Sequence, residues 1–166
     1  MSLDKVIPRF VADVMLGSLS RWLRLFGFDT LYSNDFDDRE LIKISIQDDR
    51  ILLTRDHSLA RSKLLKKVLL IHSDDIREQI KEVLSAVQCS SNLCSFKPRC
   101  PVCNGEIQRV EKDSIKALIP DYVVFVGHDF MVCISCGKIY WHGTHKKKID
   151  ELKRKILQEI DRTHQK

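Results

Sequence analysis

The sequence lacks several features that would assign it to a class at once. No apolar stretch in its 166 residues approaches the roughly 20 residues that a membrane-spanning helix needs. The first residues, MSLDKVIPRF, carry charges and are not followed by a long apolar segment, so they do not resemble a secretory signal. We therefore expect an intracellular, cytoplasmic protein with no membrane partner.

Three motifs of common enzyme families are also missing. The chain contains no serine nucleophile elbow, no glycine-rich phosphate loop and no dinucleotide-binding fingerprint. Any chemistry must therefore come from another arrangement of side chains.

Most of the chain has no excess of either charge. Residues 1–137 contain 19 basic and 19 acidic residues, whereas residues 138–166 contain nine basic and four acidic ones. The whole net charge of +5 therefore lies in the last 29 residues. A basic tail fits a polyanionic partner such as nucleic acid, and it equally fits a solvated helix.

Apolar strands and helical patterns alternate four times before residue 88. This alternation predicts an α/β fold with a mostly parallel sheet flanked by helices. Gly27 is placed to end the first helix in a left-handed conformation. The expected strands are residues 9–13, 29–33, 50–54 and 68–73, and the expected helices are 16–26, 38–49, 57–67 and 75–87.

Aspartates follow all four expected strands. Because the carboxyl ends of parallel strands share one edge, we expect these side chains to converge in a cleft. Closely spaced carboxylates need a counter-charge, and Mg²⁺ or Mn²⁺ prefers such oxygen ligands. An ion held there could activate water for attack on a phosphodiester. The aspartates are Asp13, Asp35, Asp37, Asp38, Asp56, Asp74 and Asp75.

Helix capping is the competing explanation for these aspartates, since Asp is favoured at helix N-termini. Capping accounts for Asp38 and Asp75 individually, but less well for Asp13, which apolar residues follow. Arginines near the same edge could hold a phosphate. The candidates are Arg55 and Arg21, although Arg21 and Arg24 could equally be surface residues beside Trp22.

Four of the six cysteines form two C-x-x-C pairs, Cys100 with Cys103 and Cys133 with Cys136. In an intracellular protein such pairs indicate metal ligands, and four thiolates bind Zn²⁺ tetrahedrally. A closed site of this kind is structural and supplies folding energy that a module of about 45 residues lacks. Cys89 and Cys94 stand apart, and we interpret them as ordinary thiols.

The composition changes near residue 88, where QCSSNLCSFKPR has the character of a linker. Strand signals follow in residues 106–110 and 122–126, between the cysteine pairs. We expect three units: residues 1–90 as the α/β domain, 91–145 as a zinc ribbon, and 146–166 as a basic helix or tail.

Five segments carry a family resemblance. They are FVADVMLGSLSRWLRLFGFDTLY, DFDDRELIKIS, ILLTRD, RCPVCNG and CISCGKIYWHGTH, in that order over about residues 9–145. They resemble the Mut7-C RNase family, which joins a PIN-like nuclease domain to a C-terminal zinc ribbon. The resemblance implies metal-dependent, endonucleolytic cleavage of RNA, with the ribbon assisting RNA binding.

The resemblance also maps the acidic set of PIN nucleases onto Asp13, Asp38 and Asp56 as Mg²⁺ or Mn²⁺ ligands. Asp37 or Asp74 would supply the fourth acidic position. Because PIN-like folds include members without activity, an RNA-binding or rRNA-processing assembly factor is the alternative. A receiver-like phospho-accepting domain also clusters acids at strand ends, but the sequence offers no suitable lysine after a fifth strand.

Overall fold

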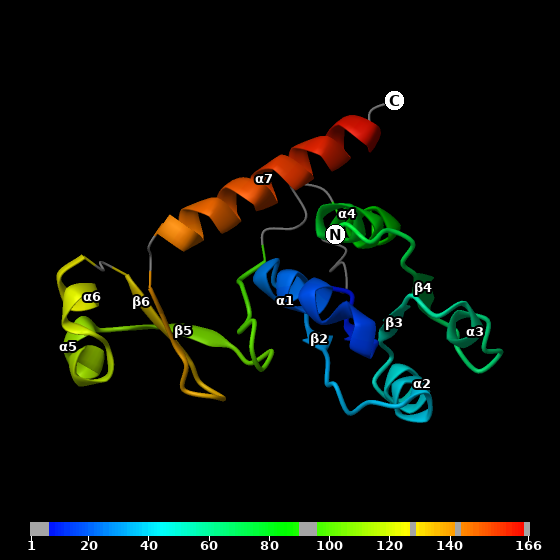
Figure 1. Ribbon diagram of the computed structural model, residues 1–166, viewed down its shortest axis with the longest axis horizontal. Coiled ribbons are helices and arrows are strands. Elements are labelled where there is room, and N and C mark those ends of the chain that lie inside the picture. Colours follow the sequence, from blue (N-terminus) through cyan, green and yellow to red (C-terminus); the bar gives the residue numbers. More distant parts are fainter. Residues whose placement is uncertain (1–6, 90–95, 127–128, 142–143, 165–166) are drawn as a thin grey trace, which may run out of the picture.

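The computed structural model describes residues 7–89, 96–126, 129–141 and 144–164 (Figure 1). These residues form a four-stranded sheet with its helices, a three-stranded sheet with two short helices, and a long C-terminal helix that extends over both (Figure 1). The expected linker near residue 90 lies largely outside the described residues.

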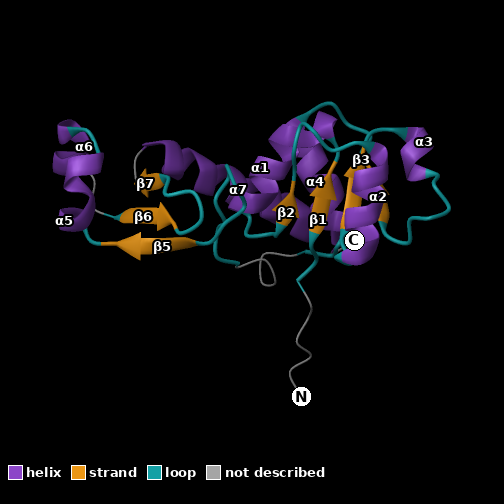
Figure 2. Ribbon diagram, turned by 90° about the horizontal axis from the view of Figure 1, so that it is seen from below, coloured by secondary structure: helices purple, strands orange, loops and turns teal. Residues whose placement is uncertain are grey.

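The first sheet has the order β2-β1-β3-β4, and every pair of neighbours is parallel (Figure 2). The α/β fold with a parallel sheet is therefore confirmed. The chain passes from β2 across β1 to β3, so the topological switch point lies between β1 and β3. The elements are β1 (Phe10–Ala12), the 3-10 helix η1 (Val14–Leu16), α1 (Gly17–Leu25), β2 (Thr30–Leu31), α2 (Asp38–Gln47), β3 (Ile51–Thr54), α3 (His57–Ala60), β4 (Val68–Leu70) and α4 (Ile76–Ala86).

Both faces of this sheet are covered, α1 and α4 lying on one side and α2 on the other (Figure 1). Successive strand residues point to opposite faces. Phe10 and Ala12 join the apolar cluster under α1 and α4, whereas Val11 between them joins the cluster under α2. Burial on both faces explains why the strands are continuous apolar runs.

Two local predictions can be compared directly with this half of the chain. Gly27 has a φ of 97°, so its left-handed role after α1 is confirmed. The helix expected over residues 57–67 is wrong in its length, because α3 ends at Ala60. Turns follow it, in which the amide of Ser62 donates to the Leu59 carbonyl and that of Leu65 to the Ser62 carbonyl.

The second sheet is antiparallel, with the order β5-β6-β7. The strand expected at residues 122–126 is wrong, because this segment is helical and follows Pro120. Val123 of this helix packs with Ile115, Ile119 and Phe130 in a small apolar cluster, and this packing outweighs the strand propensity of the segment. The elements are β5 (Ile107–Val110), α5 (Lys112–Ile115), the 3-10 helix η2 (Lys116–Leu118), α6 (Asp121–Val126), β6 (Phe130–Cys133) and β7 (Ile139–Trp141).

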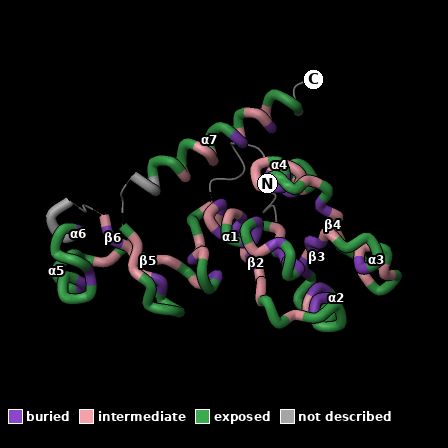
Figure 3. Tube along the Cα trace, viewed as in Figure 1, coloured by how far each residue is buried: buried purple, intermediate pink, exposed green. Residues whose placement is uncertain are grey.

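The C-terminal helix α7 (Thr144–His164) packs back onto the first half of the chain (Figures 1 and 3). Ile156 and Ile160 are buried in the same cluster as α1 and α4. Glu159 forms ion pairs with Arg77 and Lys81 on α4. One face of α7 is thus part of the core, and the basic residues lie around the rest. No helix in the described ranges combines the length and apolar character needed to cross a membrane.

Candidate metal centres

The four paired cysteines meet at one end of the second sheet. Cys100 and Cys103 lie in the turn before β5, Cys133 is the last residue of β6, and Cys136 lies in the turn between β6 and β7. Their sulfur atoms all lie within 4.8 Å of one another, with 3.7 Å between Cys100 and Cys136 and 3.4 Å between Cys103 and Cys133. A tetrahedral zinc site with Zn–S bonds of about 2.3 Å has sulfurs about 3.8 Å apart. This cluster could therefore bind a metal such as zinc.

Hydrogen bonds prepare these sulfurs for a metal. Burial raises the pKa of the Cys100 thiol, but the Tyr140 hydroxyl, 3.0 Å away, and the amides of Cys103 and Val102 outweigh it and lower the pKa to about 6. Burial and then the contact with Cys100 raise the pKa of Tyr140, so its hydroxyl stays protonated. Burial likewise raises the pKa of Cys133, but the amides of Cys136 and Ser135 outweigh it and lower the pKa. The Gly105 amide lowers the pKa of Cys103, but burial and the neighbouring sulfurs outweigh it and raise the pKa to about 12. The hydrogen bonds therefore favour the thiolate that metals require at Cys100 and Cys133.

Both cysteine turns close through a residue in the left-handed region. Asn104, with φ 67°, donates its amide to the Cys100 carbonyl, and Gly137, with φ 72°, donates its amide to the Cys133 carbonyl, each at 2.9 Å. These turns bring the two sulfurs of each pair to the same point.

The other two cysteines do not belong to this cluster. Cys89 is buried and disulfide-bonded, so the prediction that it is an ordinary thiol is wrong. Cys94, for which we made the same prediction, lies outside the described residues.

Asp13 lies at the carboxyl end of β1 and is only 7% exposed. It occupies the position before η1, yet its side chain makes no capping hydrogen bond. Its carboxylate instead accepts a hydrogen bond of 2.7 Å from the Thr54 hydroxyl at the end of the neighbouring strand β3. Capping therefore does not explain Asp13.

Asp56 lies beside it, after β3. The Thr54 hydroxyl that donates to Asp13 accepts from the Asp56 amide at 3.0 Å, so one side chain joins both aspartates at the switch point. Asp56 also caps α3, but Oδ1 accepts all the capping hydrogen bonds from Ser58 and Leu59. The hydrogen bonds from Ser58, followed by that of the Leu59 amide, lower the pKa of Asp56, which stays anionic. Capping thus leaves Oδ2 of Asp56 available for another role.

Two neighbouring aspartates divide their roles at the start of α2. The N-cap is Asp37, whose carboxylate accepts from the Glu40 amide at 2.8 Å. The prediction that Asp38 caps this helix is therefore wrong. Asp38 is the first helical residue, and it is exposed.

The remaining candidates at this edge are Arg55, Arg21 and the pair after β4. Asp74 forms an ion pair with Arg55, and Asp75 caps α4 by accepting from the amides of Arg77 and Glu78. Arg21 is an exposed residue of α1. A phosphate that binds Arg55 would have to replace Asp74 as its partner.

Asp13, Asp38 and Asp56 thus follow three neighbouring strands, in agreement with the parallel topology. Within the described residues, however, they do not form a group of closely placed ligand atoms as the cysteines do. Their carboxylates are the oxygen donors that Mg²⁺ and Mn²⁺ prefer. Their role as metal ligands stays a prediction.

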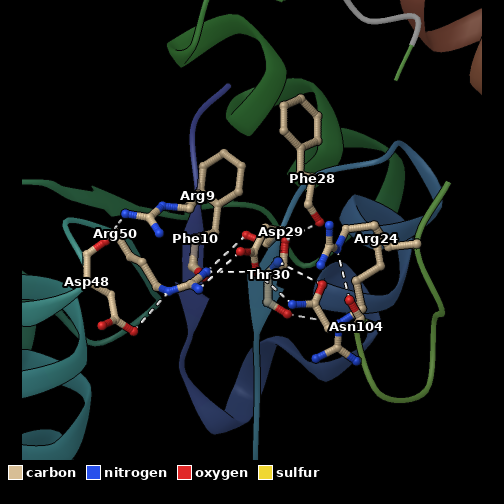
Figure 4. A network of polar contacts seen from close by, with 10 residues as sticks. Arg9, Phe10, Arg24, Phe28, Asp29, Thr30, Asp48, Arg50 and Asn104 are labelled. Atoms are coloured by element: carbon tan, nitrogen blue, oxygen red, sulfur yellow. Dashed lines mark hydrogen bonds and ion pairs between the residues drawn. The ribbon is translucent and has the colours of Figure 1, made fainter. Parts of the chain in front are cut away.

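A buried polar network joins the cysteine turns to the first sheet (Figure 4). Arg24 of α1 is only 4% exposed, so the interpretation of Arg24 as a surface residue is wrong. Its guanidinium donates to the Thr30 carbonyl at 2.9 Å and to the carbonyls of Pro101 and Val102 at 3.0 and 3.1 Å. Arg24 therefore fixes the first cysteine turn against α1 and β2.

Asn104 completes this network from the other side. Its side-chain oxygen accepts from the Thr30 amide at 3.0 Å, and its side-chain nitrogen donates to Asp29 at 2.7 Å (Figure 4). Asp29 also binds Arg50 through both carboxylate oxygens, at 2.8 and 3.1 Å. Burial raises the pKa of Asp29, but the hydrogen bonds from Arg50 and Asn104 outweigh it and lower the pKa. The sequence gives no sign of these partners of Asn104.

Comparison with known proteins identifies a family. The family model described as the Mut7-C RNAse domain matches residues 8–153. This range includes the parallel sheet, the cysteine cluster and the first part of α7. No curated protein and no solved structure matches the chain.

Proposed function

The chain belongs to the Mut7-C RNAse domain family, and on that premise we propose that it is a metal-dependent endoribonuclease. In this proposal residues 1–90 form a PIN-like nuclease domain, 91–145 a zinc ribbon and 146–166 a basic helix. The observation that most supports it is Asp13, a buried carboxylate at the switch point of a parallel sheet with no capping role. Open α/β sheets bind their ligands at this point.

Each residue at the edge has a stated role in the proposal. Asp13, Asp38 and Asp56 would hold Mg²⁺ or Mn²⁺, which supplies charge stabilisation and a more acidic water. Thr54 orients the Asp13 carboxylate through its hydroxyl. Arg55 and Arg21 would bind phosphates, Arg55 in place of its ion pair with Asp74, and Asp37 stabilises the helix that carries Asp38.

The cysteine cluster has a different role. Cys100, Cys103, Cys133 and Cys136 would hold Zn²⁺ in a closed site, which leaves no coordination position for a substrate. Its contribution is to fold the ribbon, which assists RNA binding together with the basic residues of α7. Such binding should weaken steeply as salt is added.

The second candidate function is RNA binding or rRNA-processing assembly without cleavage. It is favoured by the capping roles of Asp37, Asp56 and Asp75, because these explain part of the acidic edge without catalysis. Incubation of the zinc-loaded chain with labelled RNA or DNA, and with Mg²⁺, Mn²⁺ or EDTA, separates the two functions. Internal RNA fragments that require an ion support the nuclease. If no ion gives cleavage, the non-cleaving function stands.

A further inference from the structure

A cavity lies where the second sheet, the last residue of α1 and the first half of α7 meet. Its volume is about 190 Å³, and its lining is mainly apolar. It borders the polar network of Figure 4, since Pro101, which accepts from Arg24, lines it. Further lining residues are Leu25, Met131, Tyr140, Trp141 and Ile149.

The size of the cavity selects the kind of ligand. Small-molecule and cofactor sites usually occupy about 300–1,000 Å³, so 190 Å³ is too small for most of them. An apolar cavity of about 150 Å³ accepts benzene. The cavity therefore has room for one planar ring.

The lining is suited to stacking with such a ring. Trp141 is 40% exposed, so its indole is accessible from solvent. The Tyr140 hydroxyl is engaged with the Cys100 sulfur, which leaves its ring as the group that lines the cavity. Aromatic side chains stack with any nucleobase because every base has a π-face.

Charged residues of α7 border the cavity, and the two that line it are Asp150 and Lys153. Lys153 lines it and is held by a hydrogen bond of 2.8 Å to the Leu25 carbonyl. Lys147 and Lys148 are exposed and lie two residues and one residue before the lining residue Ile149. These ammonium groups complement the phosphates on either side of a bound base.

We propose that this cavity binds one base of single-stranded RNA, stacked on Trp141, while adjacent phosphates contact Lys147 and Lys148. The proposal rests on the proposed ribonuclease function. α1 begins near Asp13 and ends at the cavity, and its nine residues span about 13 Å. The base bound there is thus distant from the cleaved bond and positions the strand.

The test measures binding in a chain that is prevented from cleaving. The zinc-loaded Asp13→Asn protein is titrated into a fluorescent 12-residue oligouridylate, and the dissociation constant is measured by anisotropy. Trp141→Leu should weaken binding about tenfold, the range seen for loss of one base–aromatic stack. Tyr122→Leu, which removes an aromatic side chain that is 68% exposed in the same half of the chain, should change nothing.

An oligomer of the same length without bases separates stacking from phosphate binding. Asp13→Asn and its Trp141→Leu derivative should bind this backbone equally. If Trp141→Leu binds both oligomers as tightly as its parent, or loses the same factor for both, the proposal is overturned. Zinc content and thermal unfolding show whether each variant is folded. Should Trp141→Leu lose its zinc, Ile149→Phe, which fills the cavity from α7, decides by the same criteria.

The wild-type chain, assayed for cleavage of the same RNA, keeps the two proposals distinct. If the wild type cleaves RNA and Trp141→Leu leaves binding unchanged, the base-binding role of the cavity is refuted and the ribonuclease function stands. Base-dependent binding through Trp141 without cleavage by any ion refutes the ribonuclease and leaves the cavity as an RNA-binding site.

Discussion

The two candidate metal centres differ in how the fold assembles them. The four sulfurs come from two short turns, and they lie within 4.8 Å of one another. Asp13, Asp38 and Asp56 follow three different strands, and the Thr54 hydroxyl links the Asp13 carboxylate to the Asp56 backbone amide. Local turns can position thiolates before any metal arrives, whereas carboxylates without an ion repel one another.

The two halves of the molecule differ in the same way in their cores. The parallel sheet has apolar clusters on both faces, and these include α1, α2 and α4. The second sheet has one small cluster around Phe130. We therefore expect the second sheet to depend on its metal, whereas the parallel sheet has a larger core to which α7 also contributes.

Removal of zinc should have the largest effect, and it should act on one half of the molecule. Structural zinc sites contribute about 10 kcal/mol or more to folding, so a chelator or Cys133→Ser should unfold the second sheet. Hydrogen exchange should then be fast in β5, β6 and β7 and remain slow in β1 and β3. Simultaneous loss of protection in both sheets would show that the first half depends on the ribbon.

Loss of Asp13 is the next largest effect, and it acts on activity. Asp13→Asn should lower the cleavage rate at least about a hundredfold, which corresponds to about 2.7 kcal/mol of transition-state stabilisation. Zinc content should not change. Asp75→Asn is the matched control, because it makes the same chemical change at a residue that caps α4. If both variants cleave equally well, the Asp13 carboxylate is not catalytic.

Asn104 tests the network that joins the two halves. Asn104→Ala removes the partners of the Thr30 amide and Asp29, and such losses cost about 1–3 kcal/mol of unfolding free energy. Asn104→Gly removes the same side chain but tolerates the φ of 67° without strain. Chemical denaturation should therefore rank wild type above Asn104→Gly and Asn104→Ala lowest. Equal stability of wild type and Asn104→Gly would mean that the side-chain contacts contribute nothing.

The sequence predicts how strands and helices are arranged better than it predicts which side chains form hydrogen bonds with one another. Strand and helix alternation is sufficient for the parallel sheet, and the spacing and turns of the cysteines are sufficient for the cluster. The role of Arg24 could not be predicted, because its acceptors are carbonyls 77 and 78 residues away in the chain. The sequence also could not show whether Asp37 or Asp38 caps α2, because both residues are aspartates and either position fits the start of the helix.

Acidification probes the same network more gently. The pKa of Asp29 is lowered in the folded state, so its carboxylate contributes stability above its unfolded pKa of about 3.9. That contribution is lost as pH falls through the folded value. The thermal unfolding temperature of the wild type should therefore fall more steeply below about pH 4 than that of Asp29→Asn. Parallel curves would assign the acid sensitivity to other carboxylates.

The smallest predicted effect separates capping from catalysis within one helix. Asp37→Ala should cost about 1 kcal/mol of unfolding free energy, because it removes the N-cap of α2, and cleavage should largely persist. Asp38→Ala should do the reverse, lowering cleavage with little change in stability, since Asp38 makes no capping bond. Denaturation midpoints and cleavage rates of the two variants provide the check. If Asp37→Ala abolishes cleavage while Asp38→Ala leaves it intact, the carboxylates have exchanged roles, and the cap itself would belong to the metal-binding edge.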